Sequence, residues 1–531
     1  MSGVRGSAAV GSGLAPAREA RPIRMGERIH IVGAAGAGAS AAVILAHAAQ
    51  AEVSGCDRGG PSPYTPAIDA LGISLAGGHD ARHVTDLPPP ERLAVTKALT
   101  AIDPHNPELE AARAAGIPIE PWQQVIADAA AGRLLMGVAG THGKSTTAGW
   151  LVHVLVQAGL DPSAFVGALL PASLTGGLPS TARVGRGAPF VVEADEYAGN
   201  FDAYKPRIAI LTSAEWDHPD VFADDEAVIA TFISWLEGAS GAGAAPILIA
   251  NVADPGVAAV VERLREWRGT VCAVSLMAEG QPLTDEAGGR EMADRFGTAA
   301  NPARLLLGRV VEAGPEGTLL EIAGVRGDGG GHDVGHEDVL TTRLALAGRH
   351  NAANALGVAG AALTLGVAPN AVAAGLASFQ GVGRRLERKG DGRGVVVYDD
   401  YGHHPTAIRE TLAAIRQREP GRRIWAVYEP LTYHRTAAML EQFAEVLARA
   451  DAVAVADIWA SRDPDTTITS AAALAEAVAR RNPRIPAAAP GSVEATAAWL
   501  AGEVRSGDAV LVMGGGKSYR IAELLLESLR R

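Results

Sequence analysis

The chain has 531 residues, of which 48% are hydrophobic and 20% are charged, and its formal net charge is −12 at pH 7. This length and composition predict a globular protein of about three domains with large apolar cores. The negative charge argues against nucleic acid or an anionic membrane as the main partner, but not against a phosphorylated small molecule.

Residues 1–25 are rich in Gly, Ala and Arg and contain no continuous apolar stretch, which predicts a flexible tail and not a signal peptide. No apolar run approaches the roughly 20 residues that a membrane-spanning helix needs. The two cysteines, Cys56 and Cys272, are too few for a disulfide framework or a cysteine metal site. We therefore expect a cytoplasmic protein without membrane insertion.

Short β-branched runs alternate with Ala/Leu-rich helical stretches, which is typical of α/β domains with parallel sheets. The first unit is expected over residues 26–132. Its first strand, 28–32, is followed by Gly33, Gly36 and Gly38 in the order G-x-x-G-x-G, with Asp57 further along. This turn predicts a nucleotide diphosphate at a helix N-terminus, of NAD or of another nucleotide. The alternative is a turn that only packs a strand tightly against a helix.

The second unit, expected over residues 133–378, begins with a strand, a glycine turn containing Lys144 and Ser145, and a helix-like stretch. In a phosphate-binding loop the glycines admit the backbone, the lysine reaches the β- and γ-phosphates, and the hydroxyl binds Mg²⁺. The strict spacing fails because residue 138 is Val, so an accidental glycine turn is the alternative. The candidate phosphate-binding residues are Gly140, Thr141, His142, Gly143, Lys144, Ser145 and Thr146.

Acidic residues follow two further strands of this unit. Glu193 ends one apolar run, and His218 closes the acidic segment 213–218 after the next. Because ligands bind at the carboxyl ends of parallel strands, we expect Glu193 and His218 to share a hard cation with the phosphates. Solvated loops are the alternative.

Two polar tracts, 278–302 and 327–338, are expected to be surface loops or insertions. Asn351 and Asn354 open an alanine-rich helix, three positions apart and so on one face. They would cap the helix or hold a base, and the residues alone favour capping.

The third unit, expected over residues 379–531, holds four predicted strands at 395–398, 424–427, 452–455 and 509–512. The charged stretch 383–389 is most simply a solvated surface. Asp400, Tyr401 and His403 follow the first of these strands, and acids, an aromatic ring and imidazoles at a strand end indicate a binding or catalytic site.

Taken in order, these motifs resemble those of the Mur ligases, the ATP-dependent amide-forming enzymes of peptidoglycan precursor synthesis. The shortened phosphate loop is that family's own form. The matching segments are 30–38, 53–57, 106–113, 140–147, 193–196, 217–218, 348–351, 383–385, 400–405 and 512–516.

The resemblance implies a Rossmann-like first domain that holds the UDP of a UDP-N-acetylmuramoyl substrate, a P-loop ATPase-like central domain with a parallel sheet, and a Rossmann-like C-terminal domain that brings the amine. ATP would phosphorylate the substrate carboxylate, and the amine would then displace phosphate. The resemblance implies that His350, Asn351, Arg385 and Asp400 bind ATP beside the phosphate loop, and that Ser145, Glu193 and His218 bind Mg²⁺. The UDP substrate would contact Gly33, Gly36, Gly38 and Asp57, and the amine would contact Tyr401, His403 and Arg435. The residues assigned to catalysis are Lys144, Glu193, His218 and Arg385.

The amine is the open question. Three members of the family carry a carbamoylated lysine in the central domain, whereas no lysine occurs here between Lys205 and Lys389. The remaining branches add L-alanine, or recycle the tripeptide L-alanyl-γ-D-glutamyl-diaminopimelate. Leu431 and Thr432 stand where the alanine branch has a His and an Arg, leaving Arg435 as the cation. We expect L-alanine, with the tripeptide as alternative, and an NAD-linked dehydrogenase or a non-catalytic nucleotide-binding protein as rivals from other classes.

Overall fold

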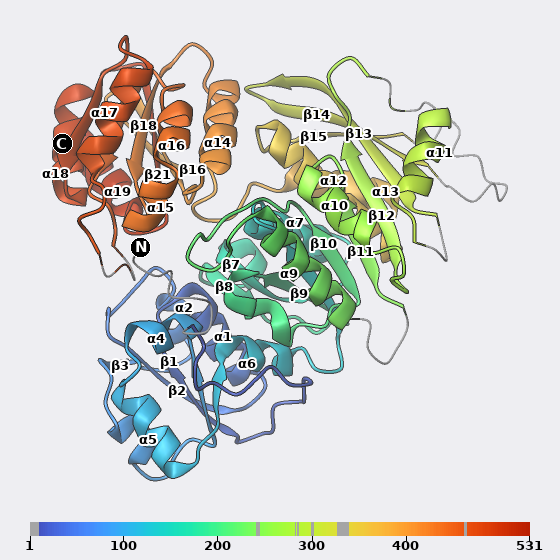
Figure 1. Cartoon of the computed structure of the whole chain (residues 1–531), viewed down its shortest axis with the longest axis vertical. Coiled ribbons are helices and arrows are strands. Elements are labelled where there is room, and N and C mark those ends of the chain that lie inside the picture. The colour runs from blue at the N-terminus through green and yellow to red at the C-terminus, as the bar shows by residue number, and fades with distance from the viewer. Residues whose placement is uncertain are drawn as a thin grey trace.

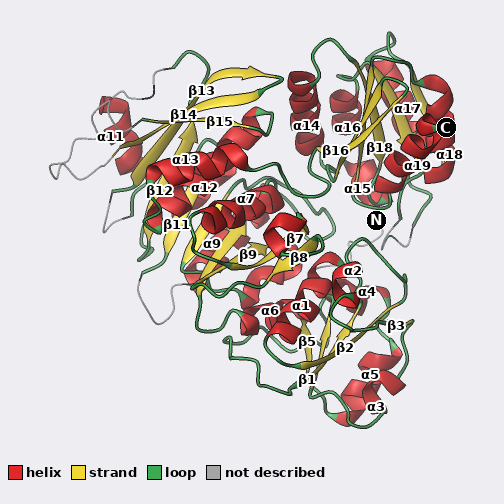
Figure 2. Cartoon of the chain, turned by 180° about the vertical axis from the view of Figure 1, so that it is seen from behind, coloured by secondary structure: helices red, strands yellow, loops and turns green. Residues whose placement is uncertain are grey.

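The computed structural model describes residues 10–239, 245–281, 283, 286–298, 302–325, 339–460, 463 and 465–531. The chain forms three α/β domains that follow one another along the sequence, each built around its own sheet (Figure 1). Helices lie on both faces of the sheets (Figure 2). Within the described residues, no helix is both long and apolar enough to cross a membrane.

The first domain has a five-stranded parallel sheet in the order β3-β2-β1-β4-β5. Its central strands are almost continuously apolar because helices cover both faces. The strands are β1 Arg28–Val32, β2 Glu52–Asp57, β3 Ala76–Gly77, β4 Arg92–Val95 and β5 Ile119–Pro121, and the helices are α1 Ala37–Ala48, α2 Pro66–Asp69, α3 Arg82–Thr85, α4 Lys97–Ile102, α5 Pro107–Ala115 and α6 Trp122–Ala129.

The central domain has a ten-stranded sheet in the order β15-β14-β13-β12-β11-β10-β6-β9-β7-β8. Its strands from β13 to β7 pair in parallel, as predicted, but antiparallel strands extend the sheet at both edges. The strands are β6 Leu134–Ala139, β7 Ser163–Leu170, β8 Ser180–Arg183, β9 Pro189–Ala194, β10 Ile208–Leu211, β11 Ile247–Asn251, β12 Thr270–Leu276, β13 Arg304–Gly314, β14 Gly317–Val325 and β15 Leu340–Leu344.

The helices of the central domain are α7 Lys144–Gln157, α8 Ala172–Thr175, the 3₁₀ segment η2 Tyr197–Ala203, α9 Asp225–Gly238, α10 Pro255–Arg263, α11 Glu286–Arg295, α12 Arg349–Thr364 and α13 Pro369–Ser378. Helix α11 occupies much of the tract 278–302, so the prediction of a loop there was wrong in part. The other predicted loop, 327–338, lies outside the described residues.

The third domain has a six-stranded sheet in the order β16-β17-β21-β18-β19-β20, parallel except for β16. The four predicted strands are confirmed as β17, β18, β19 and β21. The strands are β16 Glu387–Gly392, β17 Val395–Asp400, β18 Arg423–Glu429, β19 Ala452–Ala456, β20 Ala487–Gly491 and β21 Asp508–Gly514, and the helices are α14 Pro405–Arg418, α15 Tyr433–Ala438, α16 Leu440–Leu447, α17 Ala471–Arg481, α18 Val493–Glu503 and α19 Tyr519–Arg530.

The segment before β1 differs from the predicted tail. Residues 1–9 lie outside the described part of the chain, but the backbone N–H of Ala15 donates to Ile119 O at 2.8 Å. Arg18 pairs with Glu120 at 2.9 Å and with Asp128 at 2.7 Å. Residues 10–25 are thus tied to the first domain by hydrogen bonds that composition alone does not predict.

Arg92 is the buried cation of the same network. Its side chain is 3% exposed and lies 3.1 Å from Glu27 and 3.0 Å from Glu120, and it also donates to Asp128. Removing one partner of a buried ionic group leaves uncompensated charge, which costs about 3–5 kcal/mol.

We therefore expect Arg92→Met to lower the stability of the first domain by about 3–5 kcal/mol. Native-state hydrogen exchange of the β1 and β4 amides measures this domain separately from the other two. Arg82→Met is the matched control, because Arg82 pairs with Asp80 at the surface, and it should change nothing measurable. Equal effects of the two substitutions would contradict this account of the network.

Candidate active site

The glycine turn between β6 and α7 forms the centre of the site. Gly140 has φ +134° and Gly143 has φ +78°, both in the region that glycine favours. A Cβ on Gly140 would lie 2.2 Å from Thr212 Oγ1, and one on Gly143 would lie 2.7 Å from Asn354 Oδ1. Both glycines are therefore required by backbone conformation and by close contacts, whereas phosphate binding at this turn stays a prediction.

Lys144, the first residue of α7, lies inside this turn and is bound to acidic groups. Its Nζ donates to Gly140 O at 2.7 Å and to Glu196 at 2.8 Å, and it lies 3.6 Å from Asp195. Burial lowers the pKa of Lys144, but the charges of Glu196 and Asp195 outweigh burial and raise the pKa above its ordinary value. The ammonium is therefore charged and is held between a carbonyl of the turn and two carboxylates.

Ser145 connects the central domain to the third. Its hydroxyl donates to Glu193 Oε1 at 3.0 Å, and Arg385 donates to the same hydroxyl at 2.9 Å. The other oxygen of Glu193 accepts from Gly167 N at 2.6 Å. Arg385 Nε is buried without a hydrogen-bond partner among the described residues. A hydroxyl, a carboxylate and a guanidinium from three separate segments thus meet at the start of α7.

His218 belongs to a different group of side chains. Donor atoms of His218, Asp195 and Glu196 lie within 4.8 Å of one another. Glu193 instead contacts Ser145, so the structure places the two predicted cation ligands in adjacent groups. Both groups carry the carboxylate oxygens that hard cations prefer.

A cavity of about 200 Å³ lies between the phosphate loop, α12 and α14. Seven of the predicted ATP-site residues line it: His142, Gly143, Thr146, His350, Asn351, Arg385 and Asp400. Helix α12 begins after Gly348 without a side-chain cap, and Asn351 donates to Ala347 O at 2.7 Å. The capping prediction for Asn351 was therefore wrong, because this side chain bonds a carbonyl at the cavity wall.

The Asp400 carboxylate accepts hydrogen bonds from the backbone around it. Its two oxygens accept from Leu386 N and Gly402 N, each at 2.7 Å, which orients the segment that carries Arg385. The Tyr401 ring lies 5.2 Å from the Arg385 guanidinium. His403 Nδ1 donates to Tyr401 O at 2.9 Å, and burial holds the pKa of His403 well below its ordinary value.

Arg435 on α15 is engaged by the central domain. It is 3% exposed, donates to Asp217 at 2.6 Å and lies 3.1 Å from His218 Nδ1. Burial raises the pKa of Asp217, but the charges of His218 and Arg435 bring it well below its ordinary value. Arg435, predicted to face the amine substrate, is thus paired with an internal carboxylate.

Glu215, which the sequence did not single out, joins the central and third domains. It lies 2.9 Å from His142 Nε2 and accepts from Thr406 Oγ1, at the start of α14, at 2.8 Å. Burial raises the pKa of Glu215, but the hydrogen bond from His142 and the charge of His404 lower it to about 2. The sequence signal that could have identified Glu215 is its position after strand β10, in the acidic run 213–218.

The predicted UDP residues have two distinct roles. Gly33 has φ +76°, and Asp57 accepts from Ala35 N at 3.1 Å, so both shape the turn before α1. Gly36 is the N-cap of α1. A Cβ on Gly38 would lie 2.2 Å from the Trp122 ring, so Gly38 serves close packing against α6.

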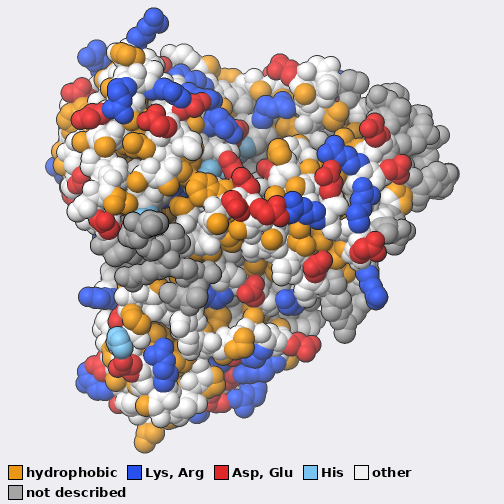
Figure 3. Space-filling model, in the orientation of Figure 1, with side chains coloured by type: hydrophobic (Ala, Val, Ile, Leu, Met, Phe, Trp, Pro, Cys, Tyr) orange, Lys and Arg blue, Asp and Glu red, His pale blue; other side chains and the backbone are white. Residues whose placement is uncertain are grey.

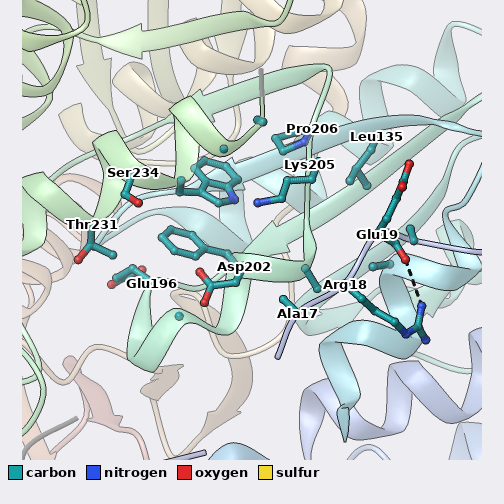
Figure 4. Close-up of a pocket in the computed structure, with 18 of the residues that line it drawn as sticks. Ala17, Arg18, Glu19, Leu135, Glu196, Asp202, Lys205, Pro206, Thr231 and Ser234 are labelled. Atoms are coloured by element: carbon teal, nitrogen blue, oxygen red, sulfur yellow. Dashed lines mark hydrogen bonds between the residues drawn. The ribbon is translucent and has the colours of Figure 1, made fainter. Parts of the chain in front are cut away.

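A wide cavity of about 1650 Å³ lies away from the phosphate loop, between the N-terminal segment and α9. Figure 4 shows Arg18 and Glu19 on one side and Asp202, Lys205 and Ser234 on the other. Glu196, which also belongs to the group formed with Asp195 and His218, lines this cavity, but none of the loop residues 140–146 does.

On the face shown in Figure 3, charges of both signs are interspersed, which is not the surface expected for binding nucleic acid.

Comparisons with known proteins agree with this geometry. Family models described as "Mur ligase family, catalytic domain", "Mur ligase middle domain" and "Mur ligase, glutamate ligase domain" match residues 28–133, 138–296 and 384–516. A UDP-N-acetylmuramate–L-alanine ligase of Kineococcus radiotolerans is 38% identical, over 94% of this chain and 96% of that protein.

Two crystal structures share the fold. The UDP-N-acetylmuramate–alanine ligase of Thermotoga maritima has a TM-score of 0.70 at 21% identity, covering 94% of this chain and 98% of that one. A murein peptide ligase of Psychrobacter arcticus has a TM-score of 0.66 at 23% identity, covering 95% and 99%.

The protein is therefore a three-domain ATP-dependent ligase that joins an acid to an amino compound. The chain belongs to the Mur ligase family. Membership in this family accounts for the glycine turn of the first domain, so the alternative of an NAD-linked dehydrogenase is not favoured.

We expect Gly140→Ala to weaken binding of a non-hydrolysable ATP analogue about 5- to 150-fold, since forcing the loop out of its conformation costs about 1–3 kcal/mol. Isothermal titration would measure this loss. Gly177→Ala is the control, because a Cβ there meets nothing within 4 Å. Unchanged affinity in Gly140→Ala would show that this turn does not hold the nucleotide.

Proposed function

We propose that this protein joins L-alanine to the lactyl carboxylate of UDP-N-acetylmuramate, using ATP and releasing ADP and phosphate. The observation that carries the proposal is the meeting of Ser145, Glu193 and Arg385 at the phosphate loop. The 38% identical relative, which bears the name of this activity, supports the choice of substrates. We also propose that the reaction takes place in the cytoplasm, where the nucleotide substrates are made.

The chemical difficulty is that a carboxylate must attack a polyanionic triphosphate. Backbone N–H groups of the loop and the start of α7 would hold the phosphates, as helix N-termini do. Lys144 would exchange its contact with Glu196 for the phosphates, and Arg385 would offer its unpartnered Nε to the transferred group. Such fixed cations stabilise the charge that develops in the transition state.

The acyl phosphate formed in this step contains the activated carbonyl carbon. The neutral amine attacks that carbon, the C–N bond forms, and the bond between carbon and the phosphate oxygen breaks. One proton leaves the nitrogen, and inorganic phosphate departs. Closure of the third domain on the central one, through contacts such as Glu215 with Thr406, would keep water away from this intermediate.

The residues at the loop fit a divalent cation of the Mg²⁺ type. Ser145 and Glu193 supply oxygens 3.0 Å apart, and Asp195, Glu196 and His218 form the adjacent group. When bound, Mg²⁺ would neutralise phosphate charge. We propose Ser145 and Glu193 as ligands of one such ion, and His218 with Asp195 and Glu196 as ligands of a second ion beside it.

A cavity of about 690 Å³ would receive the muramoyl part of the substrate. Residues of all three domains line it, including Tyr64, Leu169 and Tyr401. The cations Arg384, Arg385 and Lys389 line it too. Arg388 and Arg418 bring the cations to five, against the acids Glu387, Asp399 and Glu523. A pocket of this size with an excess of cations suits an anionic sugar diphosphate, which would enter from the turn formed by Gly33 and Asp57.

The amine would approach from Tyr401 and His403 in the third domain. Arg435 is the predicted partner of the carboxylate of the amine substrate. The Arg435 guanidinium would have to bind that carboxylate and Asp217 at the same time. Leu431 and Thr432 stand where the alanine branch has two cations, so recognition of the amino-acid carboxylate would rest on Arg435 alone. The name of the 38% identical relative favours L-alanine, and the tripeptide is the second candidate.

The proposal predicts ADP release that requires UDP-N-acetylmuramate and L-alanine together. A coupled ADP assay with L-alanine, glycine, L-serine and L-alanyl-γ-D-glutamyl-diaminopimelate in parallel arms would check it. Turnover with the tripeptide alone would move the protein to the recycling branch. Failure of every arm, in a folded sample that binds ATP, would contradict the proposed reaction.

Substitutions at the loop should separate catalysis from folding. We expect Arg385→Ala to lower kcat about 10²- to 10³-fold, because it removes one fixed cation from the developing charge. Arg481→Ala is the matched control, since Arg481 pairs with Glu445 at the surface of the same domain. Equal activities of the two variants, measured as ADP release, would remove Arg385 from the mechanism.

A further inference from the structure

The first domain contains a second cluster of metal-binding side chains, remote from the phosphate loop. His30 lies on β1, Cys56 on β2, His83 on α3 and Glu108 on α5. One donor atom from each of these four residues lies within 4.8 Å of the other three. Four elements that are separate in sequence thus converge on one point beneath the glycine turn.

The cluster is withdrawn from solvent. Cys56 and Glu108 are 0% exposed, and His30 is 2% exposed. Imidazole nitrogen, thiolate sulfur and carboxylate oxygen are the three ligand types that proteins use for Zn²⁺, usually four in a tetrahedral arrangement. None of these four residues contributes to the ligase site described above.

The spacing of the donor atoms is near that of a tetrahedral site. Zinc bonds of about 2.0–2.3 Å place ligand atoms roughly 3.3–3.8 Å apart. Glu108 Oε1 lies 3.0 Å from Cys56 Sγ and 3.7 Å from His30 Nε2. His83 Nδ1 is hydrogen-bonded to the same carboxylate oxygen and would separate from it as the ion enters.

One nitrogen of the cluster makes no hydrogen bond within the described part of the chain. His30 Nδ1 lies 2.8 Å from Ser54 Oγ, which orients the ring. His30 Nε2 is buried and directed at Glu108, yet it has no hydrogen-bond partner among the described residues. Metal-bound imidazoles are held in this manner, with one nitrogen on an orienting group and the other on the metal.

A buried carboxylate satisfied by hydrogen bonds is the simpler account of the cluster. Glu108 does accept from the Cys56 thiol at 3.0 Å, and His79 Nδ1 lies 3.3 Å from its second oxygen. That account explains the thiol and two of the imidazoles. In that account His30 Nε2 lies 3.7 Å from Glu108 Oε1, which is beyond hydrogen-bond distance, so an oriented and buried nitrogen has only a long contact.

We propose that His30 Nε2, Cys56 Sγ, His83 Nδ1 and one oxygen of Glu108 bind a zinc ion that stabilises the first domain. On binding, the S–H bond of Cys56 breaks, a sulfur–zinc bond forms, and the thiol proton passes to solvent. His79 stays beside the second oxygen of Glu108. The oxidation state of the metal does not change.

The site would act on the substrate turn through the backbone. The carbonyl oxygen of Cys56 accepts from Gly33 N and from Ala34 N, each at 2.9 Å. The next residue, Asp57, accepts from Ala35 N at 3.1 Å. A metal on Cys56 therefore holds the end of β2, and with it the turn proposed to carry the diphosphate.

Cobalt spectroscopy on the full chain tests this proposal without nucleotide or turnover, so its result is independent of the ligase proposal. Chelator-treated protein is titrated with Co²⁺ and then with Zn²⁺. We expect a thiolate-to-cobalt charge-transfer band at one equivalent of Co²⁺, with the visible bands of tetrahedral cobalt, and loss of both on adding Zn²⁺. The clusters at His218 and His142 contain no cysteine and so give no sulfur band.

Two variants and a control make the assignment specific. Cys56→Ser should abolish the thiolate band, whereas Cys272→Ser, at the other buried cysteine, should keep it. Ser54→Ala removes only the orienting hydroxyl at an exposed position and should weaken Zn²⁺ binding about 10- to 100-fold. A folded parent protein without the band, or a band lost in Cys272→Ser, would overturn the proposal, and the Ser54→Ala comparison stands even if Cys56→Ser fails to fold.

Discussion

The hydrogen bond from Arg385 to the Ser145 hydroxyl is the contact on which the rest of the site depends. It links the third domain to the first residues of α7, at 2.9 Å, while the same hydroxyl donates to Glu193. Together with the contacts of Arg435 with Asp217 and of Thr406 with Glu215, it holds the third domain against the central one beside the phosphate loop. The three sheets thus serve to bring together side chains from different domains.

Buried charges around this contact are balanced in pairs. Lys144 is bound to Glu196, and Arg435 is bound to Asp217. If Lys144 turned to a phosphate, the buried Glu196 would lose its cation, so a divalent ion held beside Asp195 and His218 would have to compensate the charge of that carboxylate. In a Mur ligase this arrangement suits a site that must take up a triphosphate and a carboxylate and then release them.

The local patterns predicted what depends on neighbours in sequence. Apolar runs gave the strands β17, β18, β19 and β21, and the glycine turn with Lys144 gave the phosphate loop. The short edge strands β16 and β20 were missed, because residues such as Arg388 and Gly390 carry no apolar signal and pair only because a neighbouring strand is there. The N-terminal segment was mistaken for a free tail, since nothing near Arg18 in sequence announces Asp128.

Long-range contacts decided the rest. The sequence by itself determined the three-domain α/β plan, the phosphate loop and the family, because these follow from periodicity and from motifs of adjacent residues. Only the tertiary structure decided that His218 groups with Asp195 and Glu196, that Asn351 bonds a carbonyl instead of capping α12, and that Glu215 joins two domains. Those pairings depend on the distances between side chains from different strands and domains, which no local pattern encodes.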